Sequence, residues 1–405
     1  MSDAILMRLR HALGESAVER DAEGRPRALP DSAEAVAQVC GLAHEQGWRV
    51  RIEGQSSWMP ADAPADLSLS TRALARIVDI APSDLVASVE AGVSIGVLQR
   101  ALETKGAWLA LDPPGRPERS LGSIVATGTA GPLRYGFGPV RDHILGGTIV
   151  TGDGRIIKAG GHVVKNVAGY DLTKLQVGGF GAFGVVTQVH LRLRALPAAR
   201  ATLVARGERD VLTHAARTLV EQRLAASAME LFSPALAGEA EWVLAVELSG
   251  SQAGVDDEIA RASLEAQVSW TRLPADREAA FWNGAARAAL GGDLTFRLGV
   301  FADGQDEIID LLAEHLDAGL IAAGAGGGLL RWSGAATVEK LRTVRRLAAE
   351  REIPLTLERA PWPTRHAFGH YGAYREGVGA LVSKLRSTFD PDPTFAVALE
   401  GVEHE

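Results

Sequence analysis

The segment 179–184 reads G-x-G-x-x-G, a pattern that often marks the dinucleotide-binding turn of a Rossmann fold. In that fold the turn must open a helix, because the helix N-terminus holds the pyrophosphate. The residues that follow, 187–194, instead alternate between two faces with a period of two, which predicts a strand. No acidic residue occurs between Gly184 and Glu208, so the ribose-binding carboxylate is missing as well. The pattern therefore excludes a Rossmann fold and predicts a glycine cluster that leads into a strand.

Glycine is unusually common along the whole chain. It accounts for 45 of 405 residues, about 11% against an average of about 7%. No collagen-like period is present, so the excess indicates turns and places where the backbone must approach something closely. Hydrophobic residues make up 46% and charged residues 23%, as in ordinary globular proteins. A chain of this length predicts two or three domains at about 150 residues each.

Charge and cysteine content restrict the class of protein. A formal net charge of −8 argues against a nucleic-acid partner, which requires a basic face. The single cysteine, Cys40, excludes an internal disulfide and any cysteine-rich metal cluster within this chain. We expect a buried structural thiol there. No run of apolar residues is long enough to span a membrane, and the N-terminus does not resemble a signal peptide, so we expect a cytoplasmic protein.

Several elements can be placed from local signals. A helix should begin after Pro30, with Asp31 and Glu34 as a capping box, and end at Gly47. A second helix should run from Ser94, its cap, to Gly106. The stretch 151–154, which reads TGDG between two apolar runs, predicts a β-hairpin.

The character of the sequence changes near Leu196. From there strands and helices alternate with fewer special glycines, which predicts an antiparallel sheet covered by helices. A loop is expected at 323–328, and a final helix should end before Pro391.

Three further segments contain residues typical of a cofactor site, like the glycine cluster at 179–184. Residues 52–57 place glycine and hydroxyl residues after a strand, where successive backbone amides form an anion-binding nest or only a simple turn. Residues 120–131, after the LDPPG stretch, form a second Gly/Ser/Thr-rich segment that we expect to be a loop. Tyr170 and Asp171 stand shortly before the opening glycines, and Tyr170 is better explained by packing than by catalysis.

Taken in order, these motifs resemble the FAD-binding domain of the vanillyl-alcohol oxidase/PCMH superfamily. The resemblance runs from about Pro30 to Leu196, with an echo in LRSTFDP near the C-terminus. Within the superfamily the chain is most similar to the FAD-binding E subunits of bacterial glycolate oxidases, through LDPP, AGPLRYG, VRDHILG and KNVAGYDLTKL. The resemblance implies an α+β fold: two α+β subdomains that clamp FAD, and a cap domain with an antiparallel sheet. The implied organisation is an N-terminal segment 1–29, an FAD-binding domain 30–196, a cap 197–375, and a C-terminal helix and tail 376–405 that return to the FAD domain.

The resemblance also implies which residues contact FAD. Four would wrap the pyrophosphate: Gly54, Gln55, Ser56 and Ser57. Two would border the flavin: Pro113 and Pro114. Six would line the diphosphate and the ring: Leu121, Gly122, Ser123, Ala126, Thr127 and Gly131. The remaining four bring the backbone to the flavin or adenine: Gly181, Gly184, Val185 and Val186.

The sequence departs from the superfamily pattern at Glu53, which would place a negative charge beside the diphosphate unless it points away. No histidine stands in this loop, so FAD should be bound non-covalently. The cap lacks the HxHxGDGN-like metal motif of related hydroxy-acid dehydrogenases, and no metal site is expected. His366 and His370 have i,i+4 spacing without the glutamate of a zinc helix, so ordinary polar packing is the better interpretation.

Catalytic residues remain unassigned. Arg297, Arg331 and Arg359 lie on expected cap strands, where an arginine can bind a carboxylate with two hydrogen bonds. A structural role is the better interpretation for each of them.

Three functions are consistent with these features. The first is an FAD-binding subunit of a glycolate-oxidase-like complex, with a D-type flavoprotein subunit and an F-type iron–sulfur subunit, that oxidises a 2-hydroxy acid such as glycolate to the 2-oxo acid. Any membrane association would then come through these partners. The second is a self-sufficient FAD-dependent alcohol or hydroxy-acid oxidoreductase. The third is a flavin-free assembly subunit, an interpretation that Glu53 favours.

Overall fold

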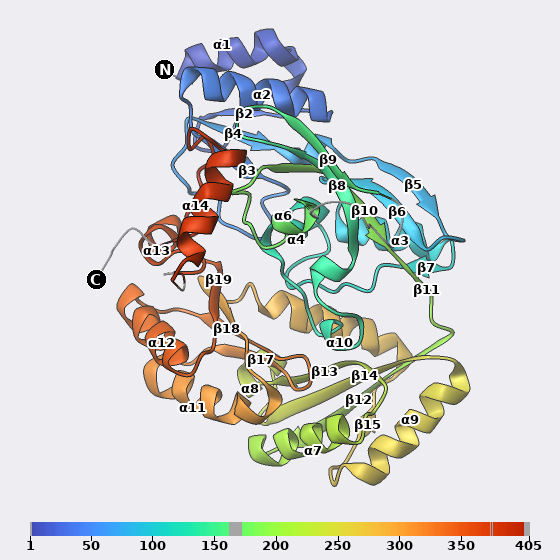
Figure 1. The fold of residues 1–405 in the computed structure, drawn as a ribbon. Helices are drawn as coiled ribbons and strands as arrows, with labels where there is room; N and C mark the ends of the chain where they lie inside the picture. The colour runs from blue at the N-terminus through green and yellow to red at the C-terminus, as the bar shows by residue number, and fades with distance from the viewer. Residues whose placement is uncertain (1, 162–171, 373, 375, 401–405) are drawn as a thin grey trace.

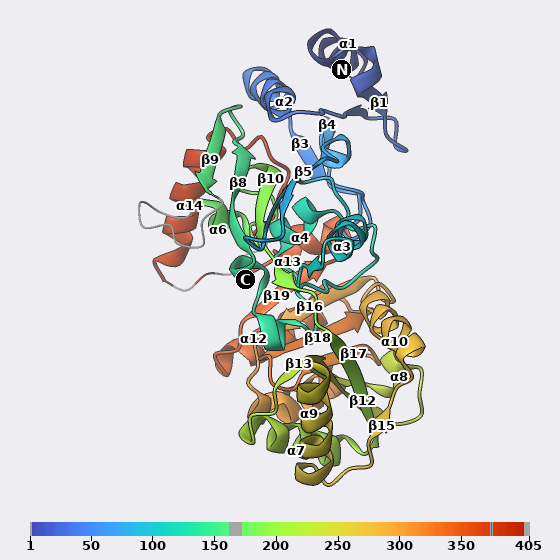
Figure 2. The ribbon, with the colours of Figure 1, turned by 90° about the vertical axis from the view of Figure 1, so that its right-hand side faces the viewer.

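The computed structural model describes residues 2–161, 172–372, 374 and 376–400. The chain forms an upper body, which contains the N-terminus and strands β1–β11, and a lower body built on one large sheet (Figure 1). Figure 2 shows the same division after a quarter turn. Within the described ranges, no helix has both the length and the apolar content needed to cross a membrane.

The upper body begins with a four-stranded mixed sheet in the order β1-β2-β4-β3. Its strands are β1 (Val18–Arg20), β2 (Pro26–Ala28), β3 (Val50–Glu53) and β4 (Leu67–Ser70), with helices α1 (Ser2–Leu13) and α2 (Ala33–Gln46) packed against it. The predicted capping box of α2 is wrong, because the N-cap is Ser32, whose Oγ accepts a hydrogen bond from Ala35 N at 3.2 Å. The predicted end is confirmed by Gly47, which adopts φ 65°.

A five-stranded antiparallel sheet follows, in the order β5-β6-β10-β8-β9. Its strands are β5 (Ile77–Ala81), β6 (Val86–Glu90), β8 (Ile144–Val150), β9 (Ile156–Gly160) and β10 (Val185–Arg192). The predicted hairpin at 151–154 is confirmed between β8 and β9. The predicted strand after the opening glycines is confirmed as β10, which pairs with β6 and β8 at the centre of the sheet.

Short elements connect this sheet to the rest of the upper body. They are η1 (Glu15–Ala17), η2 (Thr71–Ala73), α3 (Ile95–Glu103), β7 (Ala107–Trp108), α5 (Arg134–Phe137), η3 (Val140–Asp142), α6 (Leu172–Gln176) and β11 (Arg194–Ala195). Ser94 caps α3 as predicted, by accepting a hydrogen bond from Val97 N. Helix α3 ends with Thr104 as its C-cap, two residues before the predicted stop at Gly106.

The predicted loop at 120–131 is wrong over its first part, which forms helix α4 (Leu121–Thr127). Ser120 caps this helix by accepting from Ser123 N, and Gly128 ends it at φ 60°. The buried side chains of Leu121, Ile124 and Val125 give the helix its apolar face. Small residues are typical of loops, but here they let a helix approach its neighbours closely.

The lower body is an eight-stranded sheet in the order β15-β12-β14-β13-β17-β18-β16-β19, and every pairing in it is antiparallel. Its strands are β12 (Ala199–Gly207), β13 (Ala226–Phe232), β14 (Trp242–Gly250), β15 (Thr271–Arg272), β16 (Leu294–Leu298), β17 (Leu320–Gly324), β18 (Leu329–Gly334) and β19 (Leu355–Arg359). The predicted antiparallel sheet is confirmed. The loop expected at 323–328 is shorter, because β17 continues through Gly324.

The two faces of the large sheet have different partners. One face packs on α7 (Arg209–Glu221), α9 (Gln252–Glu265), α11 (Gln305–His315) and α12 (Val338–Glu350). The other face looks toward the upper body and carries α8 (Pro234–Ala237) and α10 (Ala275–Ala288) (Figure 1). A short 3-10 turn, η4 (Ala302–Gly304), precedes α11.

The C-terminal region joins the two bodies. It contains α13 (Trp362–Phe368) and α14 (Val378–Phe389), which ends just before Pro391 as predicted. Beyond α14, Val50 N of β3 donates to Thr394 O at 2.7 Å, and Ala396 N donates to Val50 O at 2.9 Å. The same segment accepts hydrogen bonds from His370 N and Tyr371 N. The segment 394–399 therefore adds to the sheet edge at β3 while it contacts the chain that leads from the large sheet.

Candidate functional site

A cavity of about 140 Å³ lies where the end of β3, helix α4, the glycine cluster and the C-terminal segment meet. Its floor is the loop 54–58, which directly follows β3. Within the described part of the chain, none of the backbone amides from Gln55 to Trp58 donates a hydrogen bond. Ser56 adopts φ 51°, a left-handed conformation of the kind that occurs in anion-binding nests. Such a run of free N–H groups is a nest that binds anions.

Two glycines allow this loop and α4 to approach each other and their neighbours. A Cβ at Gly54 would overlap Ser120 Oγ, the atom that caps α4. A Cβ at Gly122 would lie 2.9 Å from Ala91 Cβ. On the opposite wall, Gly184 has φ 135°, and a Cβ there would lie 2.8 Å from Val150 O. The glycines thus bring three backbone segments around one cavity.

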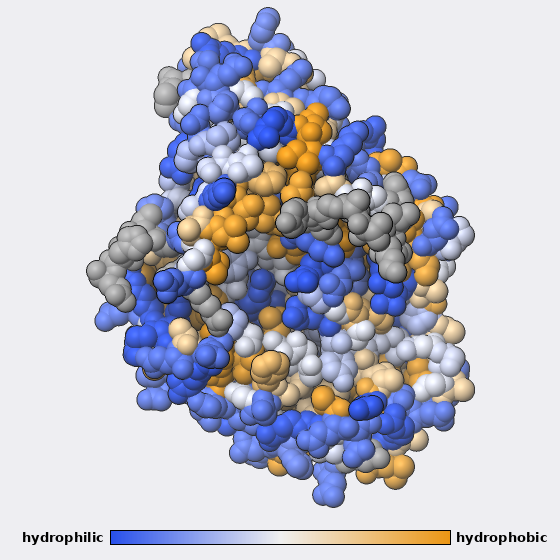
Figure 3. All heavy atoms as spheres, viewed as in Figure 1, coloured by the Kyte–Doolittle hydropathy of each residue, from blue (hydrophilic) through white to orange (hydrophobic). Residues whose placement is uncertain are grey.

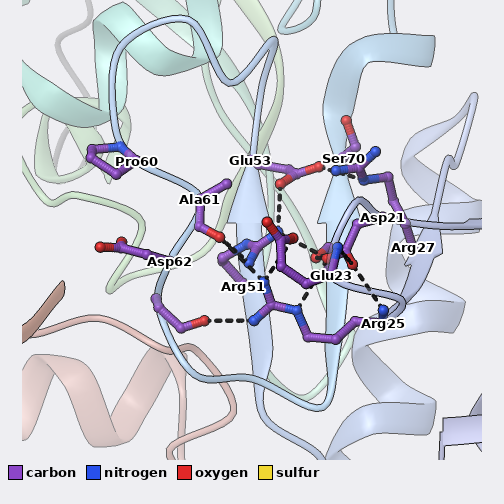
Figure 4. Close-up of polar contacts among 12 residues, drawn as sticks. Asp21, Glu23, Arg25, Arg27, Arg51, Glu53, Pro60, Ala61, Asp62 and Ser70 are labelled. Atoms are coloured by element: carbon purple, nitrogen blue, oxygen red, sulfur yellow. Dashed lines mark hydrogen bonds and ion pairs between the residues drawn. The ribbon is translucent and has the colours of Figure 1, made fainter. Parts of the chain in front are cut away.

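Glu53 does not place an uncompensated charge in this cavity. Its carboxylate pairs with Arg27 Nε at 2.7 Å and with Arg51 Nη2 at 3.1 Å (Figure 4). Arg51 also contacts Asp21, which in turn pairs with Arg25. The concern that Glu53 repels a diphosphate therefore loses its basis, because two guanidinium groups neutralise the carboxylate.

We expect the substitution Glu53→Gln to change FAD affinity by less than about threefold, while the free energy of unfolding falls by about 1–3 kcal/mol. The reason is that Arg27 and Arg51 lose a charged acceptor, whereas the loop amides are untouched. Flavin fluorescence titration and urea denaturation measure the two quantities. Markedly tighter FAD binding in the variant would show that the carboxylate does act on the cofactor.

A buried guanidinium stands behind α4. Arg119 is fully buried and donates to Pro114 O at 2.9 Å and to Thr127 Oγ1 at 2.5 Å. Its guanidinium lies 4.3 Å from the ring of Trp58, and burial lowers the pKa of Arg119 to about 9. Among the described residues no carboxylate pairs with it. Arg119 itself lines neither cavity, and its contacts hold Thr127 and Trp58, which do line the amide-lined cavity.

Glu358 lies at the contact between the upper and lower bodies, which is called the seam below. Its carboxylate pairs with Arg331 Nε at 2.7 Å and with Arg297 Nη1 at 2.8 Å. Burial opposes its ionisation, but the two arginines outweigh burial and lower the pKa of Glu358 to about 2. Arg331 also donates to Ala130 O at 3.0 Å, and Arg359 Nε donates to Trp58 O at 3.0 Å. All three predicted arginines thus have structural partners.

The structure brings most of the predicted cofactor residues together. Eleven of the sixteen line the 140 Å³ cavity: Gly54, Gln55, Ser56, Ser57, Gly122, Ser123, Ala126, Thr127, Gly181, Gly184 and Val186. Three line a second, larger cavity: Pro113, Pro114 and Gly131. Two are buried in apolar cores and line neither cavity: Leu121 and Val185. Contact with FAD remains a proposal for each of these residues.

Several cavity residues were missed from the sequence. Ala396–Ala398 close the cavity from the C-terminal segment, and the only signal for them was the LRSTFDP echo just before. Phe180 adopts φ 51° and stacks on His370 with ring centroids 3.6 Å apart. Arg365 also lines the cavity. These residues come from distant parts of the chain, and no local sequence pattern predicts that they lie close together.

The histidine pair does not form one helical face. Helix α13 ends at Phe368, His366 is exposed, and His370 is buried with its Nδ1 2.6 Å from Leu357 O. Over the described residues, no group of three or more His, Cys, Asp or Glu side chains is arranged to hold a metal ion. Tyr170 and Asp171 lie outside the described residues.

Comparison with known proteins agrees with this geometry. Residues 26–160 match the family model of an FAD binding domain. The chain is 42% identical over 142 residues to glycolate oxidase subunit GlcE of Escherichia coli, a match that covers 35% of this chain and 40% of that protein. It is 35% identical over 130 residues to glycolate oxidase subunit GlcD of Bacillus subtilis, covering 32% of this chain and 28% of that protein. The matches therefore span less than half of the length of these relatives.

Solved structures with the same fold cover nearly the whole chain. A 4-ethylphenol oxidase from Gulosibacter chungangensis superposes with a TM-score of 0.74 at 14% identity, over 97% of this chain and 96% of that one. An alkyldihydroxyacetonephosphate synthase gives 0.74 at 12% identity, over 98% and 85%. The fold is that of PCMH-type FAD-binding proteins, and the predicted cofactor FAD is confirmed.

Proposed function

Because the chain carries a PCMH-type FAD-binding domain, we propose that it is the FAD-binding subunit of a complex that oxidises a 2-hydroxy acid, such as glycolate, to the 2-oxo acid. Its partners would be a D-type flavoprotein subunit and an F-type iron–sulfur subunit. The oxidation removes one hydrogen from carbon and one from the hydroxyl, and FAD supplies a two-electron acceptor for such a reaction.

One observation carries the proposal. Residues 26–160, which match the model of an FAD binding domain, include the loop after β3 and α4, and these two segments build the amide-lined cavity. The free amides of Gln55 to Ser57 fit the diphosphate of FAD. In this proposal the loop would hold the diphosphate, Thr127 and Arg119 would fix α4 beside it, and Phe180 would close the cavity from the opposite wall.

The flavin-free assembly subunit is less well supported by the structure. The sequence feature that favoured it, Glu53, is paired with Arg27 and Arg51. The self-sufficient oxidoreductase keeps one supporting observation. A second cavity of about 520 Å³ lies between the upper body and the large sheet, and it is lined by buried acidic side chains.

Visible absorption spectra of the purified chain, recorded under nitrogen before and after glycolate is added, separate the three functions. We expect flavin bands that persist with glycolate alone and bleach once the D-type and F-type subunits are co-purified with the chain. Bleaching by the chain alone would favour the self-sufficient enzyme. A chain without flavin bands after incubation with FAD would support the assembly subunit.

A matched capture experiment tests the complex itself. The tagged chain, expressed in its native cell, should retain a dehydrogenase-like flavoprotein and an iron–sulfur protein. A tagged Ala126→Leu chain, which should bind FAD at least about 100-fold more weakly, shows whether capture depends on the cofactor. If neither partner is retained by the FAD-loaded chain, the proposed complex is wrong.

A further inference from the structure

The residues proposed to contact one FAD molecule are divided between two cavities. The first cavity, of about 140 Å³, has the 54–58 loop with its free amides as its floor. The second cavity, of about 520 Å³, lies between the upper body and the large sheet, and its wall includes Pro113 and Pro114. Figure 3 shows one face of the molecule, hollowed between its upper and lower parts. In the proposed function the diphosphate would occupy the first cavity and the flavin ring would reach the second.

Arg119 contacts the walls of both cavities and lines neither of them. Its side chain is fully buried, and each nitrogen of its guanidinium donates a hydrogen bond. Nη1 donates to Pro114 O at 2.9 Å, and Pro114 lines the second cavity. Nη2 donates to Thr127 Oγ1 at 2.5 Å and Nε donates to Ser123 Oγ at 3.4 Å, and both of these residues line the first cavity. One rigid, planar group therefore joins the walls of the two cavities.

The indole ring of Trp58 makes a second connection between the same walls. Trp58 lines the first cavity and is 3% exposed. The guanidinium of Arg119 lies 4.3 Å from the centroid of this ring. A Cβ at Gly115, in the loop that lines the second cavity, would lie 3.2 Å from Trp58 Cε3. The ring therefore packs against both Arg119 and the loop around Gly115.

Both loops are also anchored to the lower body. Trp58 O accepts a hydrogen bond from Arg359 Nε of β19 at 3.0 Å. Gly115 N donates to Ala286 O of α10 at 2.8 Å. Because β19 and α10 are different elements, these two anchors do not hold one loop against the other. Arg119 and Trp58 connect the loops directly.

Fold stability alone does not account for a guanidinium at this position. Among the described residues no carboxylate pairs with Arg119, and Glu358, which acts on it at longer range, is already held by two other arginines. A buried cation without its own counter-ion costs free energy that an apolar side chain of similar shape does not. What an apolar side chain cannot supply is the set of three hydrogen bonds, and these join the walls of the two cavities.

We infer that Arg119 is a positioning residue that fixes the flavin-bordering loop relative to α4 and the 54–58 loop, so that one FAD molecule fits both cavities at once. Arg119 acts through Pro114, Thr127 and Trp58, and it does not itself contact the cofactor. The inference rests on the proposed placement of FAD, and it goes beyond that placement by naming the residue that couples the two cavities.

Fragments of the cofactor test this coupling by isothermal titration calorimetry. ADP carries the diphosphate without the flavin ring, and riboflavin carries the ring without the diphosphate. In Arg119→Met each fragment should bind within about threefold of its affinity for the parent chain, because each is free to settle in its own cavity. FAD should bind at least about tenfold more weakly, equivalent to about 1.4 kcal/mol, because its joined halves need both cavities at one fixed separation.

The spectrum of the bound flavin separates positioning from a loss of fold. At saturating FAD, the visible circular dichroism of the flavin should be weaker in Arg119→Met than in the parent chain, because the ring is no longer held in one orientation. The far-ultraviolet spectrum should be unchanged. Arg119→Lys keeps the positive charge but lacks the planar group with three donor nitrogens, so it should behave like Arg119→Met, and it replaces that variant if Arg119→Met does not fold.

The matched control is Arg194→Met. Arg194 also lies over an aromatic ring, 5.6 Å from the centroid of Phe137, and it lines neither cavity. This variant should bind FAD, ADP and riboflavin as the parent chain does.

Three results would overturn the inference: parental FAD affinity in Arg119→Met, a loss of ADP or riboflavin affinity as large as the loss of FAD affinity, or parental FAD affinity in Arg119→Lys. A parent chain that binds no FAD would contradict the proposed placement of the cofactor as well. Failure to capture partner subunits bears only on the proposed complex.

Discussion

The substitution Glu358→Ala should lower the free energy of unfolding by about 3–5 kcal/mol. The buried carboxylate holds Arg331 and Arg297 on adjacent strands, and its removal leaves two guanidinium groups without their counter-charge. Arg331 also reaches Ala130 O in the upper body, so the loss acts at the seam between the bodies. Urea denaturation followed by circular dichroism measures the effect.

The matched control is Glu350→Gln, which removes the exposed ion pair between Arg346 and Glu350. An exposed pair of this kind contributes about 0.5 kcal/mol or less. A Glu358→Ala chain that is as stable as this control would show that Glu358 does not secure the seam.

The same carboxylate predicts a dependence of stability on pH. The pKa of Glu358 is lowered from its ordinary 4.5 to about 2, so its contribution is fully present above pH 4.5. That contribution is lost as the pH falls from 4.5 toward 2. In Glu358→Gln, the part of the acid-induced loss of stability that comes from Glu358 should be absent. Acid titration of both chains, followed by circular dichroism, measures this. If stability falls equally steeply in the two chains between pH 4.5 and 2, Glu358 is not the group responsible.

The substitution Ala126→Leu should weaken FAD binding by at least about 100-fold, equivalent to about 2.8 kcal/mol. Ala126 lies on α4 and lines the 140 Å³ cavity, so an isobutyl group there occupies space that the cofactor needs. Leucine is nearly as good a helix former as alanine, and α4 itself should persist. Flavin fluorescence titration of the apoprotein gives the affinity.

The control for this variant is Ala349→Leu, which places the same group on the exposed face of α12. Its FAD affinity should equal that of the parent chain. The outcome that contradicts the site is an Ala126→Leu chain that keeps its circular dichroism spectrum and still binds FAD with parental affinity.

Much of the fold could be predicted because strand periodicity and helix caps depend only on residues that are close in the sequence. The period-two pattern after Gly184 is enough to specify β10, since one face of the strand is buried and the other is not. Ser94, through its side-chain oxygen, and Gly47, through its backbone N–H, satisfy backbone groups that any helix end leaves unpaired. The turn expected within 52–57 corresponds to the loop that follows β3, because glycine and hydroxyl residues come directly after a strand.

Tertiary contacts account for the misses. Helix α4 is built from residues typical of loops, and it forms because its apolar side enters the core while its glycines let neighbouring backbone approach. The pairing of Glu53 with Arg27 and Arg51 depends on which strands are neighbours, which no local pattern contains. The second cavity arises from strands that are distant in sequence, so its acidic lining was not recognisable.

The C-terminal segment sets the order of events during synthesis. Ala396–Ala398 line the first cavity, and Phe395 is fully buried in the core formed by α1, α2 and β3. Until residues 394–398 have been synthesised, the nascent chain has neither a closed cavity nor the hydrogen bonds that complete the sheet edge at Val50. The cavity is therefore complete only after the segment around residue 398 has left the exit tunnel, and by then the whole lower body has already been synthesised.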